Sequence, residues 1–147
     1  MPKENPLGGQ HHRAPEHMTI RRANTDIVTA PDGISTGPFK VEPLLRSSVD
    51  GENTAMRAIV GPGVITHWHS HPRGQLLYVL SGKGRACVAG GEIVDLHPGD
   101  SIWFAPHERH WHGATDDMTF SYLSIQTIAD GASVHWFDPI TAKEHAS

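Results

Sequence analysis

Histidines placed two residues apart, at two separate points of the chain, are the residues best suited to do chemistry. The chain holds 12 histidines, and the first pair, His69 and His71, follows Gly63 in a strand-like stretch. Side chains two apart on a strand point to the same face, so both imidazoles can aim at one point. After a tight turn at Gly74, Gln75 offers a carboxamide oxygen beside them. These three side chains predict one side of a metal site.

The second pair, His110 and His112, follows a strand and a turn later in the chain. Three imidazoles and one amide oxygen leave two open positions on a six-coordinate metal. That donor set suits Mn²⁺, Fe²⁺, Ni²⁺ or Zn²⁺ together with a bound substrate. The predicted ligands are His69, His71, Gln75 and His110. His112 has the strand parity of His110, so we expect it to face the cavity without binding the metal.

Each of these residues also has an ordinary structural interpretation. A single His-x-His pair usually only makes a strand surface polar, and Gln75 could simply hydrogen-bond a neighbouring strand. Two pairs separated by turns and a hairpin's length of chain favour the metal site. His67 has the strand parity of His69, but one strand rarely supplies three histidines to one metal. We expect His67 at the pocket rim or behind the ligands, and His112 could instead only orient a ligand.

Short strands joined by turns are what the remaining sequence predicts around these residues. Gly (15) and Pro (11) are frequent and charged residues, at 19%, are sparse, which favours β-structure over a helical bundle. Turn signals separate runs that are rich in β-branched and aromatic side chains. The predicted strands are Lys40–Leu45, Ala55–Val60, Gln75–Leu80, Lys83–Ala89, Glu92–Leu96, Ser101–Phe104 and Thr119–Thr127.

This spacing of short strands indicates an all-β sandwich or closed barrel. Gly82 and Gly90-Gly91 are expected to turn two successive hairpins, which would make the middle of the chain an antiparallel meander. We expect the tail after Trp136 to form a short helix or simply to end.

One domain is expected, with a tail in front of it. Residues 1–18 are polar and lack periodicity, so they predict a mobile tail, and residues 19–147 a single domain. The net charge of −4 argues against a nucleic-acid partner. No run approaches the roughly 18 apolar residues that a membrane helix needs. The single cysteine, Cys87, favours a reducing compartment, and we expect the cytoplasm.

The first histidine pair resembles the first motif of the cupin superfamily, G-x5-H-x-H-x3-E-x6-G. Every spacing fits from Gly63 through the two histidines to Gly82, with Gln75 where glutamate is usual. The second motif, G-x5-P-x-G-x2-H-x3-N, is kept at Gly99 and His110 only. The resemblance covers roughly residues 40–128. It implies a double-stranded β-helix, or jelly-roll barrel, with the metal site inside it.

A narrower resemblance is to small bacterial cupins that include manganese-dependent hydroxynitrile lyases and cupins associated with carboxymuconolactone decarboxylase-like proteins. It rests on the runs His69–Gln75 and Glu108–Ala114. By position it implies the four ligands named above, manganese as the metal, and His112 as a pocket histidine. The lyases carry another pocket histidine where Tyr122 stands here. The remaining expected pocket residues are Met56, Ala58, His67, Ser124 and Gln126.

We predict a metal-dependent, lyase-type enzyme that acts on a small hydroxy or carbonyl compound. Gln75 leaves the site's formal charge at +2 where glutamate would give +1, and this favours Lewis-acid chemistry over a redox cycle. The metal would bind a substrate oxygen, and His112 would move a proton with help from Tyr122. Two alternatives stay open: an Fe²⁺-dependent dioxygenase of a small aromatic or enol substrate, and a non-catalytic binding module.

A homodimer or homotetramer is expected, since small cupins pair through strand edges and an outer sheet face. We expect Trp103, Trp111 and Trp136 to contribute to such a face. Apart from copies of itself, the only predicted partner is a small-molecule substrate.

Overall fold

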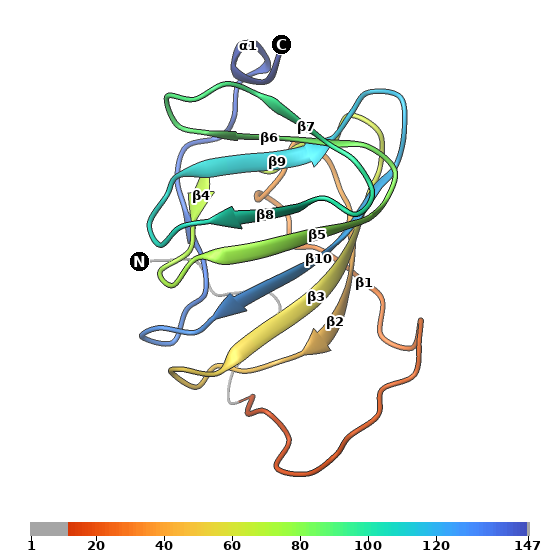
Figure 1. Cartoon of the computed structure of the whole chain (residues 1–147), viewed down its shortest axis with the longest axis vertical. Helices are drawn as coiled ribbons and strands as arrows, with labels where there is room; N and C mark the ends of the chain where they lie inside the picture. The colour runs from red at the N-terminus through yellow and green to blue at the C-terminus, as the bar shows by residue number, and fades with distance from the viewer. Residues whose placement is uncertain (1–11, 147) are drawn as a thin grey trace.

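Two antiparallel sheets face one another across a shared core in the computed structural model, which describes residues 12–146 (Figure 1). The first sheet has the order β1-β2-β3-β10-β5-β8 and the second the order β11-β4-β9-β6-β7. This is the predicted double-stranded β-helix. The elements are β1 Val28–Thr29, β2 Lys40–Leu45, β3 Asn53–Val60, β4 His69–Ser70, β5 Gln75–Ser81, β6 Gly84–Val88, β7 Val94–Leu96, β8 Ser101–Phe104, β9 His110–Ala114, β10 Phe120–Thr127, β11 His135–Trp136 and α1 Ala142–His145.

All seven predicted strands are confirmed, with ends that differ by at most two residues. Four further strands are present among the described residues. Three of these, β1, β4 and β11, have two residues each, which is too short for any periodicity to show. The fourth, β9, reads His-Trp-His-Gly-Ala, and its burial on both faces removes the alternation that marks a half-buried strand.

The inner face of the first sheet forms the main core. On β5 the side chains alternate, with Gln75, Leu77 and Val79 buried and the residues between them exposed. Leu77 and Val79 pack in a cluster that also includes Phe104 and Phe120. Since β5 begins with Gln75 on this inward face, the same alternation that builds the core also turns the carboxamide inward.

A second apolar cluster covers the opposite face of β9. Trp111 is fully buried there and packs with Ile65, Trp68 and Ile140. The C-terminal segment crosses this face, because Phe137 N donates to Trp68 O at 2.9 Å. The strand that carries His110 and His112 is therefore held between two apolar layers, and its residues are all buried.

The predicted meander is wrong at Gly82, because β5 and β6 lie in different sheets. β5 pairs with β10 and β8, whereas β6 pairs with β9 and β7. The chain crosses between the sheets at Gly82, which has φ of 77°. A Cβ there would lie 1.7 Å from Thr119 O, so the crossing needs glycine as much as a hairpin would. The hairpin at Gly90-Gly91, between β6 and β7, is confirmed.

Residues 1–11 of the predicted tail lie outside the described residues. The described part contacts the loop after β2: Ser48 N donates to His12 O at 2.9 Å, and Ala14 N donates to Glu52 Oε1 at 2.9 Å. The mobile tail stays a prediction. Over residues 12–146 no helix is long and apolar enough to cross a membrane, and the cytoplasmic location stays a prediction.

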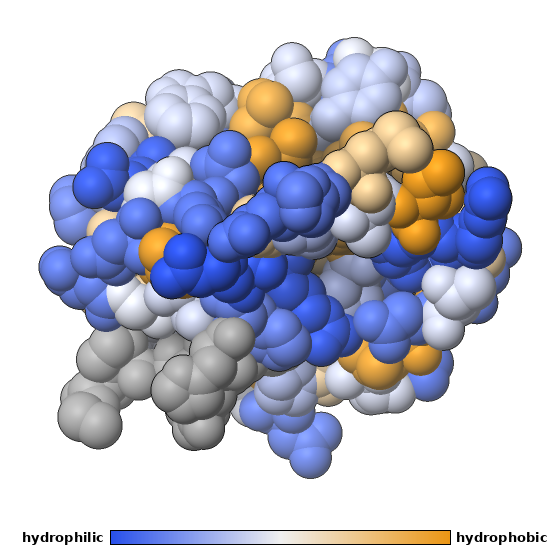
Figure 2. All heavy atoms as spheres, turned by 90° about the horizontal axis from the view of Figure 1, so that it is seen from below, coloured by the Kyte–Doolittle hydropathy of each residue, from blue (hydrophilic) through white to orange (hydrophobic). Residues whose placement is uncertain are grey.

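The three tryptophans differ in exposure, and a contribution to a dimer face stays a prediction for the exposed Trp103 alone. Trp103 is 59% exposed on the outer face of the first sheet, where it pairs across the strands with Leu76, itself paired with Ile125. Trp111 is buried by the C-terminal segment, and Trp136 lies half-buried against His69. The face seen from below in Figure 2 is mostly hydrophilic, with hydrophobic side chains in separate patches.

The homodimer stays a prediction, now centred on the outer face around Trp103. Light scattering at micromolar concentration is expected to give twice the mass of one chain. Trp103→Lys is expected to shift the mass toward that of a monomer, because it places a charge beside Leu76 and Ile125 on the outer face of the first sheet. A wild-type protein with the mass of one chain would contradict the prediction.

Candidate metal centre

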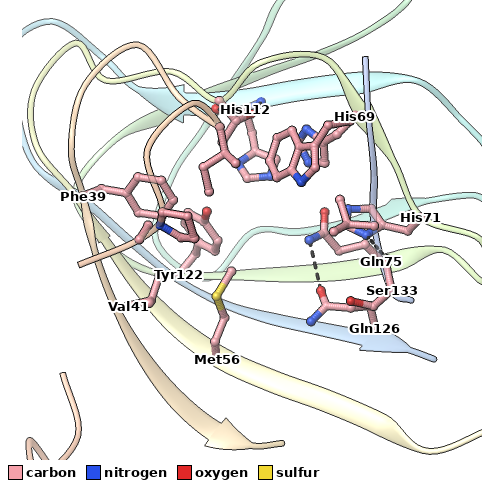
Figure 3. A pocket seen from close by; sticks show the side chains of 16 residues that line it. Phe39, Val41, Met56, His69, His71, Gln75, His112, Tyr122, Gln126 and Ser133 are labelled. Atoms are coloured by element: carbon pink, nitrogen blue, oxygen red, sulfur yellow. Dashed lines mark hydrogen bonds between the residues drawn. The ribbon is translucent and has the colours of Figure 1, made fainter. Parts of the chain in front are cut away.

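Three histidines from two strands and the following turn meet at one buried point. His69 in β4 pairs directly with His110 in β9, and His71 directly follows the last residue of β4. The ligand atoms of these three residues lie within 4.8 Å of one another, and all three side chains are buried. Figure 3 shows His69 and His71 with Gln75 on one side of the pocket. The grouping is the one that the two motifs predicted, and it could hold a metal ion.

Backbone carbonyls fix which nitrogen of each ring carries the proton. A carbonyl only accepts hydrogen bonds, so each bonded Nδ1 must be protonated and each Nε2 keeps its lone pair. Such contacts behind metal-binding histidines orient the ring and raise its basicity. The three contacts are His69 Nδ1 to His67 O at 2.8 Å, His71 Nδ1 to Ser133 O at 2.7 Å, and His110 Nδ1 to Glu108 O at 2.8 Å.

The amide oxygen of Gln75 adds a fourth acceptor at the same point. Its Oε1 lies 3.3 Å from His110 Nε2. Because His110 is protonated on Nδ1, neither of these two atoms brings a hydrogen to the contact. Two buried acceptors this close repel each other unless a cation lies between them. The donor set of this site therefore fits a divalent transition metal on three imidazoles and one oxygen.

Burial keeps the three histidines neutral. It is the largest cause in each case, and it lowers the pKa of His71 to about 4, that of His110 to about 2, and that of His69 well below its ordinary value. Neutral imidazole is the form that binds metals, so the lone pairs are available at pH 7.

Apolar walls surround the rest of the pocket, a cavity of about 60 Å³. They come from both ends of the chain and from β3, and include Phe39, Val41, Met56 and Val134. Among the described residues no Asp, Glu, Lys or Arg lines it. The polar groups of the pocket are thus concentrated at the histidines.

His112 and Tyr122 both line this pocket, as expected. The ring of His112 lies 5.1 Å from that of His69 and 5.2 Å from that of Tyr122. Both nitrogens of His112 are buried and have no hydrogen-bond partner among residues 12–146. Burial lowers the pKa of His112 well below its ordinary value and raises the pKa of the Tyr122 phenol, so both are neutral.

Only some of the other residues expected in the pocket line it. Met56 and Gln126 line the pocket, whereas Ser124 lies beside Gln75 and hydrogen-bonds it, and Ala58 is buried in the main core. His67 does not line the pocket, but its carbonyl lies behind His69, which is one of the two positions predicted for this residue. β4 begins only at His69, so strand parity does not extend to His67, whose Nδ1 instead accepts from Ile140 N at 3.0 Å. Its carbonyl, rather than its ring, serves the site.

Sequence reasoning missed the residues that the two chain ends contribute. Ser133 O holds His71, and the ring of Trp136 lies 4.7 Å from that of His69. Ile34 and Phe39 also line the pocket. These residues lie outside or at the margin of the two motifs. Every residue has a backbone carbonyl, so the residue type at position 133 gives no sign of the role of the Ser133 carbonyl.

Comparison with known proteins agrees with this geometry. The protein family described as Cupin domain matches residues 56–126. The (R)-mandelonitrile lyase of Granulicella tundricola is 37% identical over 110 residues, which cover 75% of this chain and 84% of that protein. The chain belongs to the cupins. A cupin-like protein from Thermotoga maritima is 30% identical with a TM-score of 0.72, covering 80% of this cupin and 89% of that chain.

The cupin fold is shared with proteins of differing activity. The polyketide cyclase RemF from Streptomyces resistomycificus has a TM-score of 0.67 at 18% identity, over 87% of this cupin and 91% of that chain. At this identity the likeness shows the fold alone. A shared fold does not fix the reaction, which depends on the residues of the site.

Removing any of the three histidines is expected to strip most of the metal. His69→Ala, His71→Ala and His110→Ala each remove one of four donors, while Gln75→Ala should weaken binding less, because an amide oxygen is the poorest donor of the set. Gln75→Glu should retain the metal. Metal per chain after dialysis is the measurement, with His97→Ala, at an exposed histidine, as the control. Full occupancy in all three histidine variants would show that the site is misassigned.

Proposed function

We propose that this cupin is a metal-dependent lyase that acts on a small, uncharged hydroxy or carbonyl compound, with Mn²⁺ as its metal. The observation that carries the proposal is the position of His112, which is buried beside the three-histidine group in an apolar pocket and whose ring nitrogens have no hydrogen-bond partner among residues 12–146. The 37% identity to an (R)-mandelonitrile lyase supports the same class of reaction.

A divalent cation at this site would act as a Lewis acid toward a hydroxyl or carbonyl oxygen. All four protein donors are neutral, so the site would keep a formal charge of +2. A glutamate in place of Gln75 would reduce it to +1 and would favour higher oxidation states. The neutral donor set therefore favours lyase chemistry over a redox cycle.

Cyanohydrin cleavage illustrates what the protein's own residues must do. The hydroxyl loses its proton, the carbon–carbon bond to the nitrile breaks, and the electron pair leaves on cyanide, which takes up a proton to give HCN. One base that takes the hydroxyl proton and returns it to cyanide balances the reaction. His112 suits this role because it is neutral and because, within the described part of the chain, neither of its nitrogens is held by a hydrogen bond.

Tyr122 stands at the position where the resemblance to the lyases implies a second histidine. Burial keeps its phenol protonated, so it can donate a hydrogen bond to a substrate oxygen but does not take up a proton near neutral pH. Proton transfer would thus depend on His112, with Tyr122 holding the substrate.

The walls of the pocket favour an uncharged substrate with an apolar body. A carboxylate or phosphate placed against Phe39, Val41 and Met56 would lose its water without gaining a partner. An aromatic or branched alkyl group would instead bury its surface there. Aryl and alkyl aldehydes and their cyanohydrins combine such a body with one oxygen.

Incubating Mn²⁺-loaded protein with benzaldehyde and cyanide is the direct test. The expected product is mandelonitrile with an excess of one enantiomer, measured by chiral chromatography. Metal-free protein and the His71→Ala variant are the controls, and neither should exceed the background reaction. O₂ uptake with a catechol or enol substrate would favour the dioxygenase instead, and turnover of neither class would favour a binding module.

His112→Ala is expected to retain the metal but to lose about 10²-fold or more in rate, the usual scale of general acid–base catalysis. Tyr122→Phe should lose less, because it removes a hydrogen bond and not the proton carrier. Metal content and rate are measured on the same samples. A metal-loaded, fully active His112→Ala protein would refute the role, and a metal-free one would make His112 a ligand.

A further inference from the structure

The amide nitrogen of Gln75 is held on the side away from the histidines. Its Nε2 donates to Ser124 Oγ at 2.9 Å and to Gln126 Oε1 at 3.1 Å. All three side chains are buried, and Figure 3 shows the carboxamides of Gln75 and Gln126 joined by this contact. An amide nitrogen has two hydrogens, and both are used here. Only the oxygen is left to face the histidines.

The same direction of donation continues behind Gln75. Ser124 Oγ donates its single hydrogen to Gln126 Oε1 at 2.6 Å, and Gln126 Nε2 donates to Thr54 Oγ1 at 2.7 Å. Every donor in this chain of contacts therefore faces away from the metal centre, and the acceptor end, Gln75 Oε1, faces His110 Nε2.

If the carboxamide of Gln75 were rotated by half a turn, its nitrogen would face the histidines and block metal binding. Gln75 Nε2 would then donate to the lone pair of His110 Nε2 and occupy it, while Gln75 Oε1 would oppose Gln126 Oε1, acceptor against acceptor. The contacts with Ser124 and Gln126 oppose that turn for as long as Gln126 presents its oxygen.

We propose that Ser124 and Gln126 are positioning residues that fix Gln75 with its oxygen toward the three-histidine group, so that position 75 serves as a metal ligand. The inference rests on the proposed metal site and extends it to the residues behind the ligands. Ser124 and Gln126 thus act on the metal through Gln75.

Mn²⁺ affinity, measured from the EPR signal of free Mn²⁺ during titration, tests the proposal without any activity assay. Ser124→Ala and Gln126→Leu are each expected to weaken binding by about 10- to 100-fold, the usual effect of removing a group that orients a metal ligand. Thr127→Val is the matched control. Thr127 lies on the same strand and hydrogen-bonds Asn53 at 2.6 Å on the outer face, so its loss should leave the affinity unchanged.

A double-mutant cycle separates positioning from general damage to the strand. In a Gln75→Ala background, Gln126→Leu should cause no further loss of Mn²⁺ affinity, because there is no amide left to orient. Gln126→Glu is the conservative variant. Its carboxylate only accepts hydrogen bonds, so it forces Gln75 Nε2 to donate away from the site and should preserve or tighten Mn²⁺ binding.

Three results would overturn the proposal. They are a Gln126→Leu protein with wild-type affinity, a loss that persists in the Gln75→Ala background, and a tenfold or greater loss in Gln126→Glu. In each case a wild-type protein that binds Mn²⁺ leaves the proposed metal site intact. A wild-type protein that binds no Mn²⁺ would overturn this inference and the proposed function together. If Gln126→Leu does not fold, the Mn²⁺ affinities of Gln126→Glu and Ser124→Ala test the proposal in its place.

Discussion

The antiparallel pairing of β4 with β9 places His69 opposite His110, and the rest of the site is built around that pair. Burying two neutral imidazoles is costly unless their polar atoms are satisfied. The protein satisfies one nitrogen of each ring with a backbone carbonyl two residues earlier, His67 O and Glu108 O. The other nitrogen keeps a buried lone pair, and this is what makes a cation the natural occupant of the point where the rings meet.

Packing on both sides of β9 keeps this pair in place. Phe104 stacks on His110 with ring centroids 3.6 Å apart, and the other face of the strand carries Trp111 under the C-terminal segment. Close packing on both faces leaves the imidazole few alternative orientations. The C-terminal segment also supplies Ser133 O to His71, so it completes a candidate site whose three histidines lie in the middle of the chain.

The neutrality of the donors connects the metal centre with the pocket. A carboxylate at position 75 would accept hydrogen bonds but could not donate them to Gln126 Oε1. Glutamine at position 75 is therefore not an isolated replacement of glutamate. It is part of a hydrogen-bonded group of buried amides and hydroxyls. A divalent cation held by these neutral donors would keep its full formal charge, and no charged side chain among the described residues lines the pocket walls. Such a site would be suited to polarising a neutral molecule.

The sequence by itself determined the parts of this protein that depend on local order. Runs of β-branched and aromatic side chains between turn signals located seven strands. The spacing of two His-x-His pairs and Gln75 located the side chains that meet at the candidate metal site, because strand parity sets which face a side chain takes. That information is local, so it failed where a contact depended on distant segments. Only the tertiary structure decided that Gly82 is a crossing between sheets rather than a hairpin. Likewise, the fold placed the ring of His67 outside the pocket and buried Trp111 under the C-terminal segment. It also brought Ser133 behind His71 and Gln126 behind Gln75, since hydrogen bonds over 50 or more residues leave no pattern in the sequence.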